Sequence, residues 1–463
     1  MKKKYTIGAM FFTLLIHTAI ANVRLPAVIG NNMVLQQKSI VKLWGWADPN
    51  EKIFITTSWN NKVDSTKGDA HANWKLNIHT PIAGGPYTIT IKGYNTITLQ
   101  NILIGEVWVC SGQSNMEMSY HWGLPQMKDD IPSASNPNIR FFHVPKSTAQ
   151  TPQEKGEGSW VLCDSNMVKS FSAVAYYFGK KLNADLNIPI GLIHASWGGT
   201  PAEVWTPTEV IDSNTVLKRA AQKLNRANGW PIAPGYTYNA MIAPLTNYAI
   251  AGAIWYQGES NTGTASTYHE LFTAMIRSWR AKWQKEFPFY YVQLAPFNYG
   301  NNIIGAQLRE AQTKTLMLSK TGMVVTADLA DDTTDIHPRN KKDVGIRLGN
   351  LALADTYEQA LKGIKSPLYQ SMLINKNAII ITFTNAENGL VQKEKNIKGF
   401  FIAGADKKFY PAEVKVSGNT IRIWNKDVKQ PVAVRYAFSN TAIGNVFSKE
   451  GLPVTPFRTD DWE

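Results

Sequence analysis

Cysteine is scarce in this chain of 463 residues, which contains two, Cys110 and Cys163. Two cysteines are too few for a disulfide scaffold, and their spacing does not match a metal-binding pattern. From the sequence, a single bridge and two buried free thiols both stay open. The hydrophobic fraction of 44% is typical of a globular protein with packed apolar cores. No metal and no organic cofactor are expected.

Long apolar runs are absent after the N-terminus. The chain begins Met-Lys-Lys-Lys, continues with an apolar run over residues 7–16, and reaches Ala19-Ile20-Ala21, a small-residue pattern that precedes signal-peptidase cleavage. His17 interrupts a run that is already too short to cross ~30 Å of hydrocarbon. We therefore predict a signal peptide over residues 1–21 with cleavage after Ala21, and a secreted or periplasmic mature protein without a membrane span.

Dense runs of lysine and arginine interleaved with aromatic residues are also lacking, although the formal net charge is +13. Residues 1–21 hold three lysines and no acid, so the rest of the chain carries +10. Such an excess favours anionic partners in general. Because the positive charges are dispersed, a nucleic-acid partner is not expected, and the sequence does not indicate an oligomeric state.

Three regions of different pattern follow the predicted signal peptide. Residues 22–101 hold short alternating runs such as Ile-Val-Lys-Leu-Trp-Gly-Trp between turn residues, which predicts a β-sandwich domain. In residues 102–363, continuous apolar strands alternate with helical patterns at 172–186, 267–283 and 341–362, which predicts a parallel sheet covered by helices on both faces. The β pattern returns in residues 364–463, which we predict to be a C-terminal β domain.

Polar motifs follow several strands of this predicted sheet, at the edge where ligands bind because loops and helix N-termini converge there. The first is Gly-Gln-Ser-Asn, in which Ser114 would be a nucleophile if a base and oxyanion donors lie nearby. However, Ser114-Asn115-Met116-Glu117 also fits a capping box, in which the serine only begins a helix. Both interpretations stay open. Because Gly-x-Ser-x-Gly is absent, the α/β-hydrolase fold is disfavoured.

Two further motifs offer donors to an oxyanion. The paired glycines in Ser-Trp-Gly-Gly-Thr let backbone amides approach a ligand closely, although Thr200-Pro201-Ala202-Glu203 also fits a capping box. In Trp-Tyr-Gln-Gly-Glu-Ser-Asn, Gln257 carries an amide that can donate, and Glu259 is a carboxylate at a strand end. Each motif alone is weak, and their order along the chain carries more information.

An acid and a histidine follow the last predicted strand of the sheet. Asp335 stands two residues before His337, and among the eight histidines this spacing after an α/β strand occurs once. Histidine is the usual general base, and a carboxylate fixes its tautomer. The segment YNAMIAPL, which begins with Tyr238 and Asn239, lies between the glycine and glutamine motifs. It either lines a pocket or packs in the core.

Six segments together resemble the sialate O-acetylesterase family within the SGNH hydrolase group. They lie between Gly105 and Arg458 in the family's order, and they read GEVWVCSGQSNMEM, GLIHASWGGTPAEVWTP, YNAMIAPL, AIWYQGESN, DIHPRNKKDVGIRL and EGLPVTPFR. The resemblance implies a serine esterase with a flavodoxin-like three-layer α/β/α domain, which removes acetyl groups from carbohydrate hydroxyls.

The resemblance also implies roles for single residues. Ser114 would be the nucleophile, His337 the general base and Asp335 the acid that orients it, with Glu259 as the alternative acid. The backbone amides of Ser114 and Gly199 and the side chain of Gln257 would form the oxyanion hole. The residues beside these motifs are candidates for the substrate pocket, namely Gln113, Asn115, Trp197, Tyr238 and Asn239.

Two departures from the family pattern and two alternative functions accompany this interpretation. Many SGNH enzymes carry the acid three residues before the histidine, where this chain has Thr334. Longer members insert a β module where this chain has only residues 206–237.

The substrate is either O-acetylated sialic acid or an acetylated plant glycan such as xylan. An arginine in the pocket, from among Arg277, Arg280, Arg309, Arg339 and Arg347, would favour sialic acid because its carboxylate needs a cation. A non-catalytic glycan-binding protein is the alternative of another class.

Overall fold

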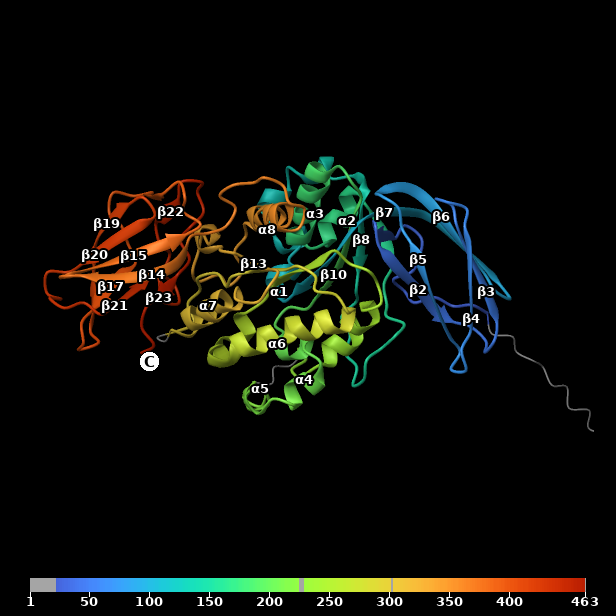
Figure 1. Cartoon of the computed structure of the whole chain (residues 1–463), viewed down its shortest axis with the longest axis horizontal. Coiled ribbons are helices and arrows are strands. Elements are labelled where there is room, and N and C mark those ends of the chain that lie inside the picture. Colours follow the sequence, from blue (N-terminus) through green and yellow to red (C-terminus); the bar gives the residue numbers. More distant parts are fainter. Residues whose placement is uncertain (1–21, 225–228, 301–302, 463) are drawn as a thin grey trace, which may run out of the picture.

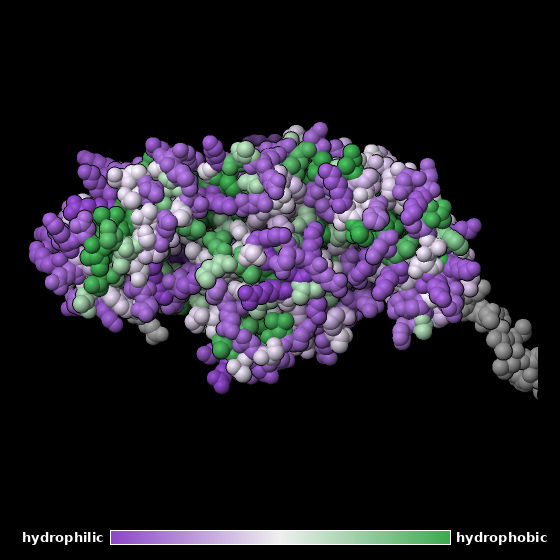
Figure 2. Space-filling view, in the orientation of Figure 1, coloured by the Kyte–Doolittle hydropathy of each residue, from purple (hydrophilic) through white to green (hydrophobic). Residues whose placement is uncertain are grey.

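The computed structural model describes residues 22–224, 229–300 and 303–462, and the predicted signal peptide lies outside them. Three units follow one another along the long axis of the molecule (Figure 1). An N-terminal β unit and a C-terminal β unit lie on either side of a central α/β unit (Figure 1). Figure 2 shows a face covered mostly by hydrophilic side chains, with apolar ones in scattered groups.

The N-terminal β unit consists of two sheets. Strands β2 (Ile40–Trp46) and β5 (Asn73–His79) form an antiparallel pair, and the second sheet joins β1, β3, β4 and β6 to the first half of β7. Val41, Leu43, Trp74 and Ile78 alternate along β2 and β5 and are buried, so they form the inner face of this pair. The other strands are β1 (Val34–Gln36), β3 (Lys52–Thr57), β4 (Val63–Lys67) and β6 (Gly84–Lys92).

One long strand, β7 (Thr96–Gly112), connects the N-terminal and central units. Its first half pairs with β6 and β1, and its second half pairs in parallel with β10 and β11 of the central sheet. A boundary between residues 101 and 102 lies inside this strand. The division of the chain into domains stays a prediction, but the two units share a continuous backbone ladder.

The central sheet has the order β13-β12-β11-β7-β10-β8-β9, and its neighbours are parallel except for β8 and β9. Val107 and Val109 of β7 face one buried cluster, whereas Trp108 and Cys110 face the other. A strand buried on both faces needs apolar residues throughout, which explains its lack of alternation. The strands are β8 (Asn136–His143), β9 (Trp160–Cys163), β10 (Ile190–Ser196), β11 (Gly252–Tyr256), β12 (Phe289–Val292) and β13 (Thr321–Val324).

Helices cover both faces of the central sheet, which confirms the predicted three-layer α/β/α fold with flanking β regions. Helices α3 (Ala173–Leu186) and α8 (Lys341–Asp355) pack together over the Trp108 face, and α6 (Ala265–Trp283) and α7 (Ile304–Thr315) lie on the Val107 face. Shorter helices complete the unit: α1 (Ser114–Glu117), α2 (Ser165–Ser170), α4 (Thr208–Asp212) and α5 (Thr215–Ala221). Cys110 and Cys163 are both free and buried.

The C-terminal unit contains three antiparallel sheets with a core of its own. The sheet orders are β14-β15-β20-β19, β16-β22 and β18-β17-β21-β23. Arg458 of β23 binds Glu310 of α7 at 2.9 Å, which ties this unit to the central one. The strands are β14 (Leu368–Asn375), β15 (Ala378–Thr384), β16 (Leu390–Gln392), β17 (Phe400–Ala403), β18 (Phe409–Pro411), β19 (Glu413–Ser417), β20 (Thr420–Trp424), β21 (Ala433–Tyr436), β22 (Val446–Ser448) and β23 (Phe457–Arg458).

Helix α8 ends seven residues earlier than the pattern over 341–362 predicts. Its last residue is Asp355, and two residues later the Tyr357 hydroxyl donates to Glu106 Oε2 at 2.9 Å and accepts from Trp108 Nε1 at 2.9 Å. The helix therefore ends just before Tyr357, whose side chain binds Glu106 and Trp108 of β7 in the central sheet. Across the described parts of the chain, no helix is both long and apolar enough to cross a membrane.

Candidate active site

The end of β7 brings Ser114 to the carboxyl edge of the central sheet. Gly112 has φ +139°, and a Cβ there would lie 2.2 Å from the carbonyl oxygen of Tyr256, so only glycine fits this turn. Helix α1 begins at Ser114, but the side chain makes no capping hydrogen bond. The capping-box interpretation of this serine is therefore wrong, and its hydroxyl is directed to another partner.

That partner is the imidazole of His337, which comes from a loop after β13. His337 Nε2 lies 3.0 Å from Ser114 Oγ, although the two residues are 223 positions apart. The imidazole stays 32% exposed and packs edge-on against Trp122, with 5.9 Å between ring centroids. Burial and the charge of Lys341 lower the pKa of His337 below 6.5, while Asp335 acts in the opposite direction. The ring is therefore neutral near pH 7, and Nε2 can accept the serine proton.

Of the two candidate acids, Asp335 lies beside the imidazole. Its Oδ1 accepts the backbone N–H of His337 at 2.9 Å and lies 3.9 Å from Nδ1. Glu259 is buried and accepts from Asn115 Nδ2 at 2.5 Å, and no contact between Glu259 and His337 occurs among the described residues. The geometry thus favours Asp335 as the acid that orients the ring, at a distance longer than a direct hydrogen bond.

Backbone amides beside Ser114 are available to an oxyanion. A Cβ on Gly198 would lie 3.2 Å from Ser114 Cβ, so the loop after β10 that holds Gly198 and Gly199, here called the glycine loop, packs directly against Ser114. The Gly198 amide donates to Glu117 Oε2 at 2.7 Å. In the described part of the chain, the amides of Ser114 and Gly199 have no protein acceptor. Gly199 has φ +75°, which turns the loop.

The side chain of Gln257 is engaged elsewhere, contrary to its predicted place in the oxyanion hole. Its Nε2 donates to Asn261 Oδ1 at 2.7 Å and to Thr200 O at 3.3 Å, and its Oε1 accepts from Tyr268 at 2.8 Å. The residue is completely buried. Gln257 therefore holds the glycine loop and the following turn together, and it cannot reach an oxyanion without losing these bonds.

Gln113 has a free donor at the site instead. Its Oε1 accepts from the amides of Gly258 at 3.3 Å and Ser260 at 3.4 Å. No acceptor for its Nε2 is found in residues 22–224, 229–300 and 303–462. The sequence predicted Gln113 as a pocket residue, and in the structure its amide nitrogen has no protein acceptor among the described residues.

The second capping-box interpretation is also wrong. The Thr200 hydroxyl donates to Trp197 O at 2.6 Å and accepts from Trp205 Nε1 at 2.9 Å, whereas the short 3-10 helix η4 (Ala202–Trp205) begins without a side-chain cap. Trp197 donates its amide to Gly112 O at 3.1 Å and packs against the core. These bonds fix the glycine loop against the end of β7.

A buried polar network begins at Asn115, the residue after Ser114, and it includes a lysine that the sequence analysis did not predict. Asn115 Nδ2 donates to Glu259 Oε1 at 2.5 Å and to Ile336 O at 3.1 Å, and Lys341 Nζ donates to Asn115 Oδ1 at 2.5 Å. Asn115 is completely buried, so it does not line the pocket. Burial lowers the pKa of Lys341 to about 7. The network ties α1 to the segment that carries His337, and its sequence signal is a lysine four positions after the histidine.

Two further predicted pocket residues lie away from Ser114. Asn239 donates to the carbonyl oxygens of Ala149 and Gln150 at 3.1 and 3.0 Å, which holds that loop in place. Tyr238 lines a separate cavity toward the N-terminal unit. Neither residue contacts Ser114 or His337 within the described residues.

One of the five candidate arginines lies at the active site. Arg339 Nη1 donates to Gly123 O at 3.0 Å, Nη2 lies 3.8 Å from Asp335 Oδ2, and the side chain is 55% exposed. Arg347 is paired with Asp328 at 2.6 Å. The others serve elsewhere: Arg280 and Arg309 are buried against backbone carbonyls, and Arg277 is exposed on α6.

Comparisons with known proteins identify the family of this chain. The family model described as "Carbohydrate esterase, sialic acid-specific acetylesterase" matches residues 104–358. The human sialate O-acetylesterase is 30% identical over 415 residues, covering 81% of this chain and 78% of the relative, and the rat enzyme is 29% identical over 487 residues, covering 90% and 89%. The crystal structure of a carbohydrate acetylesterase from Xanthomonas citri superposes with a TM-score of 0.88 at 34% identity, covering 95% of this chain and all of the other. This chain is therefore a carboxylic ester hydrolase and belongs to the sialic acid-specific acetylesterase family of carbohydrate esterases.

Proposed function

We propose that this chain is a sialate O-acetylesterase that acts through Ser114, His337 and Asp335. The observation that carries the proposal is the 3.0 Å separation of Ser114 Oγ and His337 Nε2 at the carboxyl edge of the sheet. His337 takes the hydroxyl proton as Ser114 Oγ attacks the acetyl carbonyl carbon. The C–O bond to the sugar then breaks, and the imidazolium returns its proton to the sugar oxygen. Water then attacks the acetyl-enzyme as the same imidazole takes its proton. The bond between the acetyl carbon and Ser114 Oγ breaks, the imidazolium returns the proton to Oγ, and acetate leaves.

The oxyanion of both tetrahedral intermediates is held by the amides of Ser114 and Gly199 in this proposal. Their N–H groups have no protein acceptor in the described structure. In the same proposal, the Nε2 of Gln113, the residue before Ser114, is the third donor, because it has no protein acceptor in the described structure. Removal of one such donor costs about 3 kcal/mol of transition-state stabilisation. Asp335 keeps the proton of the neutral imidazole on Nδ1 and stabilises the imidazolium by charge.

An acidic sugar is favoured by the half-exposed guanidinium of Arg339. It belongs to the same loop as His337 and is 55% exposed, so a carboxylate from solvent can pair with it. Trp122 is 43% exposed beside the imidazole and offers a ring face to the sugar. An acetylated neutral glycan such as xylan carries no group that would need Arg339. We further propose export by residues 1–21, on the sequence pattern described above.

Acetate release measured side by side on O-acetylated sialic acid and acetylated xylan tests the proposal. We expect turnover of the sialic acid ester, with a raised KM and an unchanged rate on p-nitrophenyl acetate in Arg339→Gln. The matched control is Arg277→Gln, an exposed arginine away from the site. Equal rates on both glycans, or an equal effect of Arg339→Gln on both, would reject a dedicated sialate enzyme. Activity that persists in folded Ser114→Ala would reject the mechanism.

A further inference from the structure

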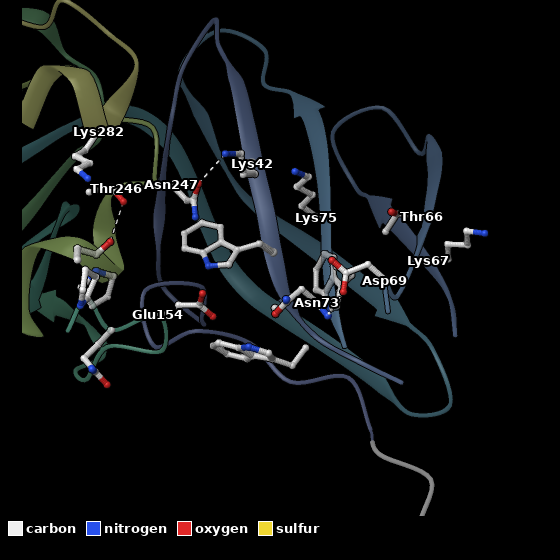
Figure 3. Close-up of a pocket in the computed structure, with 18 of the residues that line it drawn as sticks. Lys42, Thr66, Lys67, Asp69, Asn73, Lys75, Glu154, Thr246, Asn247 and Lys282 are labelled. Carbon is white, nitrogen blue, oxygen red and sulfur yellow. Dashed lines mark hydrogen bonds between the residues drawn. The ribbon is translucent and has the colours of Figure 1, made fainter. Parts of the chain in front are cut away.

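A second cavity lies between the N-terminal β unit and the central unit. Its volume is about 650 Å³, which is the size of a pocket for an oligosaccharide of a few residues. One wall comes from β2, β4 and β5, and the other from residues 152–154, 238–247 and the end of α6 (Figure 3). None of its lining residues is Ser114, Asp335, His337, Trp122 or Arg339, so the cavity is separate from the active site.

The pairing of β2 with β5 determines what faces this cavity. Trp44 lies opposite Lys75 and Trp46 lies opposite Asn73, so these four residues share one face of the pair. The other face holds the apolar residues that fill the N-terminal core. The outer face of a two-sheet unit is normally polar. Two tryptophans on this face are therefore expected to pack against another part of the molecule or against a ligand. Trp44 is 8% exposed, whereas Trp46 stays partly exposed and presents a ring to the cavity.

Polar side chains surround this ring on both walls. Lys42 reaches across the cavity and donates to Asn247 Oδ1 at 2.7 Å (Figure 3). Glu154 projects from the opposite wall, and Asn73 lies on the β5 side (Figure 3). In the described part of the chain, the side chains of Glu154 and Asn73 make no hydrogen bond or ion pair. An aromatic ring with free amide and carboxylate groups around it matches a sugar, because sugar C–H groups pack on the ring face while hydroxyls bond the polar groups.

Positive charge exceeds negative charge on the cavity wall. Four lysines line it against two acids, and one acid, Asp69, uses its carboxylate to accept the amides of His71 and Asn73 at 2.9 Å. Burial lowers the pKa of Lys42, and Lys75 lies close enough for its positive charge to lower this pKa further. An anionic ligand would relieve that repulsion. The lysines are Lys42, Lys67, Lys75 and Lys282, and Lys282 is paired with Glu209 at 3.0 Å, so the excess of positive charge rests on the other three.

We infer that this cavity is a second carbohydrate-binding site, which takes an acidic oligosaccharide by stacking a sugar ring on Trp46 and binding a carboxylate with Lys75 and Lys42. This site goes beyond the proposed esterase chemistry and would hold the glycan chain while the catalytic site acts on an acetylated sugar. It assigns a binding role to the N-terminal unit, which is otherwise a brace for the central sheet.

Binding of 3′-sialyllactose and of the neutral xylohexaose, measured by titration calorimetry on the full chain, tests the inference. We expect Trp46→Ala and Lys75→Glu to weaken 3′-sialyllactose binding about tenfold and to leave hydrolysis of p-nitrophenyl acetate unchanged. Lys75 is exposed, so its variant keeps the test valid if Trp46→Ala is unstable. Lys92→Glu, on the exposed end of β6 away from the cavity, is the matched charge control and should bind as the wild type does.

Two results would overturn the inference. One is unchanged 3′-sialyllactose binding in both cavity variants, and the other is equal or tighter binding of xylohexaose by the wild type. Acetate release from O-acetylated sialic acid is measured on the same variants. Its absence in the wild type would reject the proposed function, while the binding result would still decide the role of the cavity.

Discussion

Two serine–histidine pairs lie near the carboxyl edge of the central sheet, and they differ in their surroundings. Ser114 and His337 are 3.0 Å apart, with Ser114 8% exposed and the imidazole 32% exposed. Ser196 and His194, at the end of β10, are 2.5 Å apart, and both are 2% exposed. The other ring nitrogen of His194 faces His143 at 3.2 Å. By distance alone, the second pair would be the better candidate for a catalytic serine and its general base.

The difference shows that a short serine–histidine distance is not sufficient for catalysis. An ester and a water molecule must reach the serine, and the burial of Ser196 prevents both. Burial and the neighbouring His143 also lower the pKa of His194 far below 6.5, and the Ser196 hydroxyl serves as its hydrogen-bond partner. At the first pair, free amides lie beside the hydroxyl and the ring has one exposed side. Substitutions in both regions can test this contrast.

The largest expected effect follows from removal of each serine in turn. Ser114→Ala should lower kcat for acetate release about 10⁴-fold or more, because the nucleophile is lost. Ser196→Ala, the matched control, should retain the wild-type kcat and lose stability, because it removes the hydroxyl partner of His194 Nε2. Steady-state kinetics and urea denaturation measure the two outcomes. A large loss of kcat in Ser196→Ala, with Ser114→Ala active, would reverse the assignment.

Replacement of the two acids near the first pair should give the next largest effect. Asp335→Asn should lower kcat about a hundredfold, because the charge beside Nδ1 is removed. Glu259→Gln should give a smaller loss, because this residue contacts Asn115 and not the imidazole. The kcat ratio of the two variants on p-nitrophenyl acetate measures the difference. A larger loss in Glu259→Gln would make Glu259 the important acid.

The pH dependence of activity should depend on Lys341. Only the neutral imidazole can accept the serine proton, so kcat/KM should fall as the pH decreases through a midpoint below 6.5. In Lys341→Met, the loss of a nearby positive charge should raise the pKa of His337 and move this midpoint to higher pH. Lys342→Met is the control, because Lys342 binds Asp130 at 2.8 Å. An unmoved midpoint in Lys341→Met would contradict the electrostatic coupling.

The smallest expected effect is a pH dependence of the free energy of unfolding that comes from His194 of the second pair. The pKa of His194 is lower in the folded state than its ordinary value of 6.5, so the unfolded state binds more protons below pH 6.5. The free energy of unfolding should therefore fall as the pH decreases below 6.5, by at most about 1.4 kcal/mol per pH unit for this group. Urea denaturation at pH 7.5 and 5.5 should show a smaller fall in His194→Asn. An equal fall in both proteins would contradict this account.

Much of the fold follows from local pattern. The continuous apolar runs at β7, β10 and β11 predicted a sheet buried on both faces, and the helical patterns predicted α3 and α6 to within two residues at each end. Helix α8 was predicted too long, because the side chain that ends it, Tyr357, binds residues far away in sequence. Strand β8 and helix α7 were not among the predicted elements.

The sequence by itself determined which polar groups follow each strand of the central sheet, because each strand and the motif after it are adjacent in the chain. Only the tertiary structure decided which of these groups meet. It directed the Ser114 hydroxyl to His337, turned the Gln257 amide toward Asn261, and buried Lys341 against Asn115. Each of these contacts joins side chains whose reach and exposure depend on how whole elements pack. The same residue types at the end of β10 form a buried pair for that reason.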